Sequence, residues 1–213
     1  DAGRAGVVFE YKRNPTSPEA VTNFWQAFIR VSIENSGAEI DVPQLPPCDR
    51  TPEELTKLQE EGRMMVYNPG LSYPQLGKIF PKMNSNSVKE DSPIKDKESK
   101  PGWVDVEMDI VEMDIDSPNR DTTEEDLEKL FKSQGRNGMR ESTYICAGQA
   151  SKVLTGKYFD QGSTYSRLLG SSSGGRVVHA DFYPRGKLYV YWPLSPADHY
   201  PLLGGRSEGV KKA

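Results

Sequence analysis

Residues 178–192 carry the pattern that most constrains the fold of this chain. The stretch reads VHADFYPRGKLYVYW, and apolar residues alternate along it with polar or aromatic ones. Because successive side chains of a β-strand point to opposite faces, the alternation predicts two strands with one buried face. The residues of that face are Val178, Ala180, Phe182, Leu188, Val190 and Trp192. Residues 184–186 predict the turn between the strands, since Gly186 can adopt a positive φ.

The opposite face of the two predicted strands is polar and aromatic. Its residues are His179, Asp181, Tyr183, Lys187, Tyr189 and Tyr191. Tyrosine offers a large, rigid contact area at a low entropic cost, and aspartate and histidine adapt their hydrogen bonds to a partner. The composition therefore favours a surface that binds a ligand. The alternative is that this face packs beneath the N-terminal helices, because aromatic strand faces are commonly buried.

Size and charge narrow the class of protein. The chain has 213 residues and a net charge of −4, which argues against the basic face of a nucleic-acid-binding protein. No apolar run approaches the ~20 residues that a membrane-spanning helix needs. No signal peptide is visible, so a cytoplasmic location is the default expectation. The two cysteines, Cys48 and Cys146, exclude a disulfide framework and leave a single disulfide open.

The first part of the chain is predicted to be mainly helical. Ser17 is a suitable N-cap for a helix over residues 17–36, and Thr51 for a second helix over residues 51–61. A strand at 63–67 and a short helix at 72–80 are expected to follow. We interpret residues 1–62 as a helical accessory region that precedes the main domain.

The middle of the chain alternates between charged segments and regular elements. Residues 84–102 are highly charged and predict a mobile loop or a boundary between two parts. Residues 103–115 predict a strand with a bulge or break near residue 110. Its acidic residues Asp105, Glu107 and Asp109 are expected on a solvated face, because hard-cation sites usually gather their ligands from a curved loop. The other expected elements are a helix at 121–134, a strand at 142–146, a helix at 148–155 and a loop at 157–175.

Sequence patterns of catalytic and metal sites are few. The sequence has no HExxH, no CxxC and no phosphate-binding glycine-rich loop. His179 and Asp181 share a strand face, but two ligands are too few for a metal ion. Asp198 and His199 are adjacent, and adjacent residues rarely face each other as parts of a catalytic triad. We therefore expect a protein that is not an enzyme and that holds no metal and no cofactor.

The C-terminal segment resembles the variable proteins of diversity-generating retroelements, which have a C-type-lectin-like fold. In that family a reverse transcriptase rewrites adenines near the end of the gene, so exchanged residues alternate with fixed scaffold residues. The matching scaffold residues are Gly175, Arg176, Val177, Val178, Ala180, Phe182, Gly186, Leu188, Val190, Trp192, Gly204, Gly205 and Arg206. The resemblance implies an α+β fold, in which residues 63–213 form a C-type-lectin-like domain with a small twisted antiparallel sheet and two helices.

The same resemblance implies where a ligand binds. The ligand-binding segment is residues 163–206, and its exchanged positions are His179, Asp181, Tyr183, Arg185, Tyr189, Tyr191, Ser195, Asp198, His199 and Tyr200. The implied function is recognition of a protein or glycan by a prokaryotic or viral protein, with the oligomeric state open. One alternative is a lectin-like or assembly protein of fixed specificity. Another is an oxidase-type enzyme on a related fold, which would use His179, Asp181 and His199.

Overall fold

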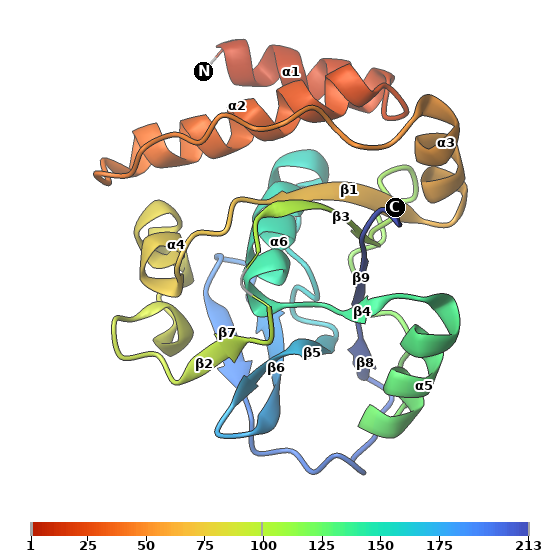
Figure 1. The fold of residues 1–213 in the computed structure, drawn as a ribbon. Coiled ribbons are helices and arrows are strands. Elements are labelled where there is room, and N and C mark those ends of the chain that lie inside the picture. Colours follow the sequence, from red (N-terminus) through yellow and green to blue (C-terminus); the bar gives the residue numbers. More distant parts are fainter. Residues whose placement is uncertain (1, 99, 213) are drawn as a thin grey trace.

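Two helices lie side by side across one end of the molecule and cover a sheet (Figure 1). The computed structural model describes residues 2–98 and 100–212. Helices α1 (Ala2–Arg13) and α2 (Pro18–Ser36) pack through Tyr11 and Phe24, whose ring centroids are 4.8 Å apart. The indole Nε1 of Trp25 donates to the carbonyl oxygen of Met65 at 2.9 Å, which joins α2 to the sheet. The helical region therefore shares one hydrophobic core with the rest of the chain.

The strands form two sheets. The first has the order β1-β3-β9-β4, with strands Arg63–Asn68, Gly102–Glu107, Ser207–Gly209 and Asn137–Gly138. The second has the order β2-β5-β6-β7, with strands Ile94–Asp96, Tyr165–Ser173, Arg176–Phe182 and Leu188–Tyr191. All of these pairs are antiparallel, and β8 (Leu203–Gly205) adds to β5 in parallel. The expected mixture of helices with antiparallel strands is confirmed at this level.

Several predicted elements are confirmed together with their caps. Helix α2 begins after Ser17, whose hydroxyl accepts from the amide of Ala20 at 3.2 Å. The capping box of Thr51 and Glu54 is present at the start of α3 (Pro52–Glu60). Short helices Tyr73–Ile79 (α4), Pro81–Met83 (η1) and Asn86–Val88 (η2) follow β1, and α5 spans Glu124–Gln134. Local capping chemistry therefore locates these ends from sequence alone.

The predicted strand at 142–146 is wrong, because these residues belong to helix α6 (Glu141–Thr155). This helix contacts β1 of the first sheet and both β5 and β6 of the second (Figure 1). Side chains on all of its faces are buried, Ser142, Tyr144 and Cys146 among them. A helix that is buried all round has no polar stripe, so its sequence does not show the period of an amphipathic helix.

Two predicted loops contain strands. Within 157–175 the structure has β5, and within 84–102 it has β2, whose Ile94 is buried. Small residues make β5 possible, since a Cβ on Gly170 would lie 2.5 Å from the carbonyl oxygen of Gly138. Serine and glycine in these segments therefore satisfy hydrogen bonds and allow close packing, whereas in a sequence they indicate a loop.

The acidic face expected on 103–115 is not solvated. The regular strand ends at Glu107, and Asp105 is buried beside the guanidinium groups of Arg136 and Arg50. Glu107 accepts from the amide of Ser207 at 2.8 Å. These carboxylates therefore attach β3 to its neighbours in the sheet.

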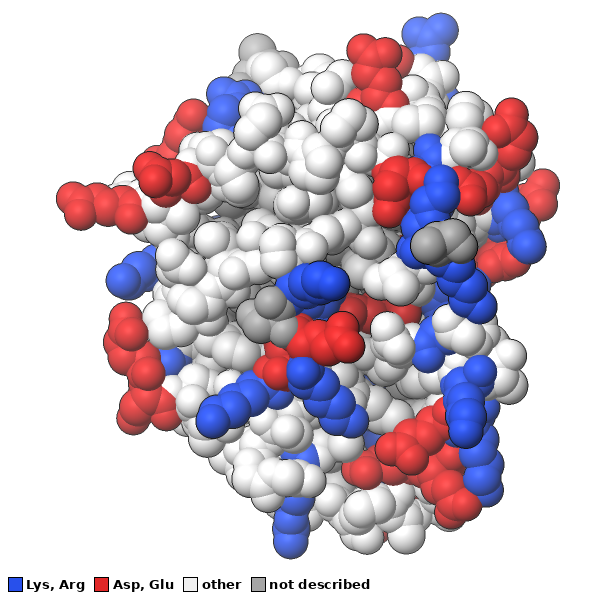
Figure 2. Space-filling model, in the orientation of Figure 1, with Lys and Arg blue, Asp and Glu red and all other residues white. Residues whose placement is uncertain are grey.

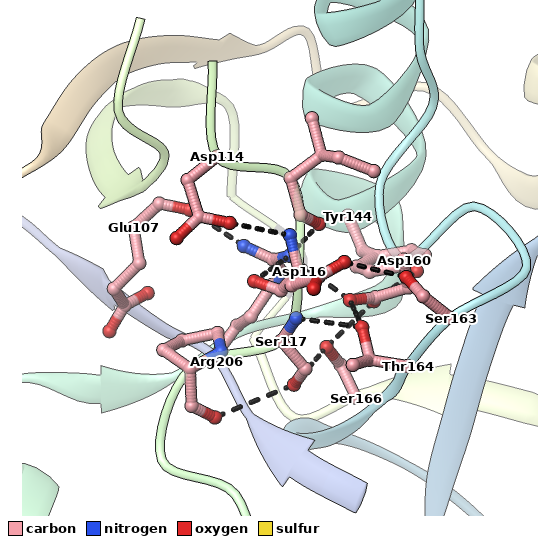
Figure 3. Close-up of polar contacts among 12 residues, drawn as sticks. Glu107, Asp114, Asp116, Ser117, Tyr144, Asp160, Ser163, Thr164, Ser166 and Arg206 are labelled. Carbon is pink, nitrogen blue, oxygen red and sulfur yellow. Dashed lines mark hydrogen bonds and ion pairs between the residues drawn. The ribbon is translucent and has the colours of Figure 1, made fainter. Parts of the chain in front are cut away.

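A buried ion pair joins the residue between β8 and β9 to the centre of the molecule (Figure 3). Arg206 and Asp160 are both buried, and the guanidinium lies 3.1 Å from the Asp160 carboxylate. Asp160 also accepts from the hydroxyls of Tyr144 at 2.7 Å, Thr164 at 2.8 Å and Ser166 at 2.8 Å. Asp160 therefore gathers one guanidinium and three hydroxyl groups around a single buried carboxyl group.

Two further observations bear on the expectations from sequence. Cys48 and Cys146 are both free and buried, so they do not pair. Within residues 2–98 and 100–212, no helix has the length and apolar character needed to cross a membrane.

Figure 2 shows Lys and Arg side chains lying among Asp and Glu side chains on the face drawn.

We predict that Asp160→Asn lowers the free energy of unfolding by about 3–5 kcal/mol, because it leaves the Arg206 guanidinium buried without a counter-charge. Urea unfolding of the purified variant measures the loss. The matched control is Asp121→Asn, which removes the carboxylate from an exposed pair with His199. The control should cost no more than about 1 kcal/mol. Equal costs in the two variants would contradict the role given to the buried pair.

Candidate ligand-binding face

The β6–β7 hairpin has one face in the core, as its alternation predicts. The strands pair in the register His179 with Tyr191 and Asp181 with Tyr189. On the inner face Val178, Ala180, Phe182 and Leu188 are buried, and Val190 and Trp192 are partly buried. The Phe182 ring stacks on Tyr158, with centroids 5.1 Å apart. The inner face is thus held by aromatic packing.

Three tyrosines form a row on the outer face of the hairpin. The centroids of Tyr183 and Tyr189 are 4.4 Å apart, and those of Tyr189 and Tyr191 are 6.0 Å apart. Lys187 places its ammonium 4.6 Å from the Tyr189 centroid. Tyr183 is 45% exposed and Tyr191 is 38% exposed. This tyrosine row (Tyr183, Tyr189 and Tyr191) is therefore an open aromatic surface, and the alternative that it packs beneath the N-terminal helices is wrong.

A tight turn presents the end of the row. The amide of Gly186 donates to the carbonyl oxygen of Tyr183 at 2.8 Å, and the amide of Tyr183 donates to that of Lys187 at 2.9 Å. Gly186 has φ of 92°, and a Cβ there would lie 2.6 Å from the Tyr158 hydroxyl oxygen. The turn therefore requires glycine, as predicted, and Arg185 lies exposed at its tip.

His179 does not lie on the open surface as the alternation predicts. Its side chain is fully buried, and its Nδ1 lies 3.2 Å from the carbonyl oxygen of Tyr191. Burial and the nearby guanidinium of Arg167 lower the pKa of His179 to about 4, so the ring is neutral at neutral pH. His179 pairs with Arg167 of β5 and with Tyr191 of β7, and it lines a cleft together with Pro193 and Leu194. Strand alternation alone does not reveal these neighbours.

A cleft of about 340 Å³ lies beside the tyrosine row. Its lining residues are Tyr165, His179, Asp181, Tyr191, Pro193 and Leu194. Burial and the nearby carboxylate of Asp160 raise the pKa of Asp181 to about 6, and a hydrogen bond with the Tyr191 side chain opposes the shift. The cleft is thus a largely apolar hollow with one carboxyl group at its wall.

The remaining predicted site residues lie on the loop that follows β7. Arg167, which is buried, donates to Glu124 at 2.9 Å and to the carbonyl oxygens of Ser195 and Asp198, and so fixes this loop against α5. The Asp198 carboxylate accepts from the Ser195 amide at 2.8 Å. It therefore stabilises its own turn.

His199 and Tyr200 are both exposed on the same loop. His199 pairs with Asp121 through Nδ1 at 2.8 Å. The pKa of Tyr165 is raised, mainly by burial and also by the nearby hydroxyl of Tyr200.

The structure brings His179, Asp181 and Tyr191 together at the cleft, and it places Tyr183 and Tyr189 beside them on the row. Sequence reasoning missed Tyr165, Pro193 and Leu194 as lining residues. Tyr165 begins β5, whose sequence YSRLLGSSS shows no alternation of apolar and polar residues, so the sequence carried no signal for it. Pro193 and Leu194 had no such signal, because a loop position follows no period.

Other candidate sites are less open to a ligand. A second cleft of about 390 Å³ adjoins α5 and β4, but its buried charges Arg136 and Arg140 already pair with Asp105 and Glu208. Among the described residues, no group of three or more His, Cys, Asp or Glu side chains is placed to hold a metal ion. The tyrosine row and the adjoining cleft are therefore the strongest candidate site.

Comparisons with protein-family models, curated proteins and solved structures give no match to this chain.

We predict that the Asp181 carboxyl group titrates with a midpoint near 6, which carbon-detected NMR of the labelled side chain measures. Tyr191→Phe should move the midpoint higher, because it removes the hydrogen bond that favours the ionised form. The folded pKa exceeds the ordinary value of 3.8, so ionisation of Asp181 opposes folding as pH rises through this range. Asp181→Asn should therefore stabilise the fold more at pH 8 than at pH 4, and a midpoint that stays near 3.8 would contradict the burial of this group.

Proposed function

We propose that this chain is a non-enzymatic ligand-binding protein that contacts its ligand through the tyrosine row and the adjoining cleft. The observation that carries the proposal is the exposure of Tyr183 and Tyr191 on a hairpin whose opposite face packs against the core. Aromatic side chains gain free energy when they are buried, so neighbouring exposed tyrosines favour contact with a partner. Tyrosine is also enriched at the energetic centres of interfaces.

The proposal extends to the family that the sequence resembles, the variable proteins of diversity-generating retroelements with a C-type-lectin-like fold. A rigid inner face supports this reading, because it allows outer residues such as Tyr183 and Tyr191 to change without repacking the core. The loop that carries Ser195, His199 and Tyr200 would then widen the variable surface beyond the hairpin. The alternative is a binder of the same geometry with fixed specificity.

We do not assign a catalytic role to the histidines. His179 is buried and its Nδ1 is occupied by a carbonyl oxygen, while His199 is exposed and paired with Asp121. A general base needs a free nitrogen within hydrogen-bond reach of its substrate. The unpaired Nε2 of His179 is buried, and His199 is not among the residues that line the cleft. The oxidase-type alternative therefore gains no support from the geometry of these residues.

We predict that the double variant Tyr183→Ala/Tyr191→Ala loses binding but keeps its stability. The probe is an array of immobilised glycans and surface proteins. The arrayed molecule that the unmodified chain binds most strongly is then used for the comparison. Loss of two exposed tyrosines should weaken that binding by about 30-fold or more, which corresponds to about 2 kcal/mol. The free energy of unfolding should change by no more than about 1 kcal/mol, because surface substitutions have small effects.

The matched control is Phe182→Ala, which changes the residue next to Tyr183 but on the inner face. It should cost about 3–5 kcal/mol in urea unfolding, as for other buried aromatic residues. If the tyrosine variant is as unstable as this control, the row is part of the core and the proposal fails. If the tyrosine variant binds as the parent does, the row is not the contact surface.

A further inference from the structure

The cleft beside the tyrosine row contains a carboxylate that the chain itself does not neutralise. Asp181 is partly buried on β6, and among the described residues no cationic side chain forms an ion pair with it. Its neighbours are the Tyr191 side chain, which hydrogen-bonds to it, and the carboxylate of Asp160. Burial of a charge without a counter-charge costs free energy. A bound cation would remove that cost.

A second hydrogen-bond acceptor lines the same cleft without a donor. Nδ1 of His179 faces the carbonyl oxygen of Tyr191, which can only accept, so Nδ1 carries the hydrogen of the neutral ring. Nε2 is then an acceptor, and it is buried with no hydrogen-bond partner among the described residues. The cleft lining therefore includes two acceptors that no cationic side chain among the described residues satisfies, the Asp181 carboxylate and the buried Nε2 of His179.

The walls of the cleft suit a flat or extended cationic group. Tyr165 and Tyr191 supply aromatic rings, and Pro193 and Leu194 supply apolar contacts. Cations are attracted to the faces of aromatic rings, and arginine stacks on them more often than lysine does. The volume of about 340 Å³ is enough for one long side chain.

We propose that this cleft binds an arginine side chain of a protein ligand, with the guanidinium donating to Asp181 and its alkyl stem lying along Tyr165, Tyr191 and Leu194. This inference rests on the proposed function, since it names the ligand group that the recognition surface takes.

The charges around the cleft agree with a cation and disagree with an anion. Arg167 is the cation close to His179, but it is already bonded to Glu124 and to the carbonyl oxygens of Ser195 and Asp198. Asp160, Asp181 and the Asp198 carboxylate are the anionic groups on the adjoining segments. A sugar hydroxyl could donate to the same acceptors, but it would leave the carboxylate without a counter-charge.

The test is an NMR titration of the full chain with N-acetyl-arginine N-methylamide. A second titration uses N-acetyl-citrulline N-methylamide, which has nearly the same shape but no charge. At about pH 7.5 the arginine compound should shift the amides of Tyr165, Asp181 and Tyr191 and saturate. The citrulline compound should bind at least about tenfold more weakly, because it lacks the charge. Lowering the pH to about 5 should weaken arginine binding about tenfold, since a carboxyl with a pKa of about 6 is then mostly protonated.

Asp181→Asn should abolish arginine binding at about pH 7.5, because the counter-charge is gone. The matched control is Asp41→Asn, which removes one exposed carboxylate far along the chain from the hairpin and should leave binding unchanged. Equal affinity for the two compounds, retention of binding in Asp181→Asn, or no shift at any cleft amide would each overturn the inference.

A glycan ligand gives a different result from an arginine ligand. Saturable shifts of the same amides by neutral methyl glycosides, without shifts by the arginine compound, would also overturn the inference. These outcomes leave the tyrosine row itself intact as a contact surface. Failure of the row is recognised separately, by unchanged array binding or by core-like instability in the Tyr183→Ala/Tyr191→Ala variant.

Discussion

The ion pair between Arg206 and Asp160 is the interaction on which the rest of the structure depends. Arg206 also donates to the carbonyl oxygens of Glu107, Ile115 and Asp116 at 2.7, 2.7 and 2.9 Å, and it lies over the ring of Phe159. A buried guanidinium is tolerated where its charge is paired and most of its donors are bonded. In Arg206 the two terminal nitrogens are bonded, and Nε has no partner among the described residues. The residues that satisfy it come from β3, from the segment that follows it, and from the turn before β5, while Tyr144 adds α6 through Asp160 (Figure 3). Arg206, which lies between β8 and β9, thus holds separate parts of the chain in one arrangement.

The candidate site follows from this arrangement. Once β5 is fixed beside Asp160, β6 pairs with it and β7 pairs with β6, so the hairpin has one face against α6 and one face outward. Stacking of Phe182 on Tyr144 and Tyr158 completes the inner face. On the outer face His179 is buried, but Tyr183 and Tyr191 are exposed, so these positions can carry side chains chosen for a ligand. Separation of the two faces is the physical basis of the proposed function.

Sequence alone predicted the parts of the fold that depend on local chemistry. Caps such as Ser17 and Thr51 and the alternation of 178–192 each act over a few residues, so the chain shows them directly. The helix predicted at 148–155 is the second half of α6, but the first half of α6 and strand β5 were missed. Their small polar residues are satisfied by distant partners, as Ser142 and Ser171 are by Asp96. The burial of His179 was missed for a related reason, since it lies between Arg167 and Tyr191 of the two adjacent strands. Long-range packing decides these features, and no local pattern contains it.

The most direct measurement of the central claim is the sequence of the DNA that flanks this gene. The account predicts a near-copy of the segment that encodes residues 174–206, beside a gene for a reverse transcriptase. Mismatches in which the copy has adenine should fall at outward codons such as those of Tyr183, Tyr189 and Tyr191, and they should spare the inner-face codons and that of Arg206. A near-copy with mismatches spread over both faces would contradict the separation of scaffold from contact surface. A locus without any such copy would contradict diversification and leave a binder of fixed specificity.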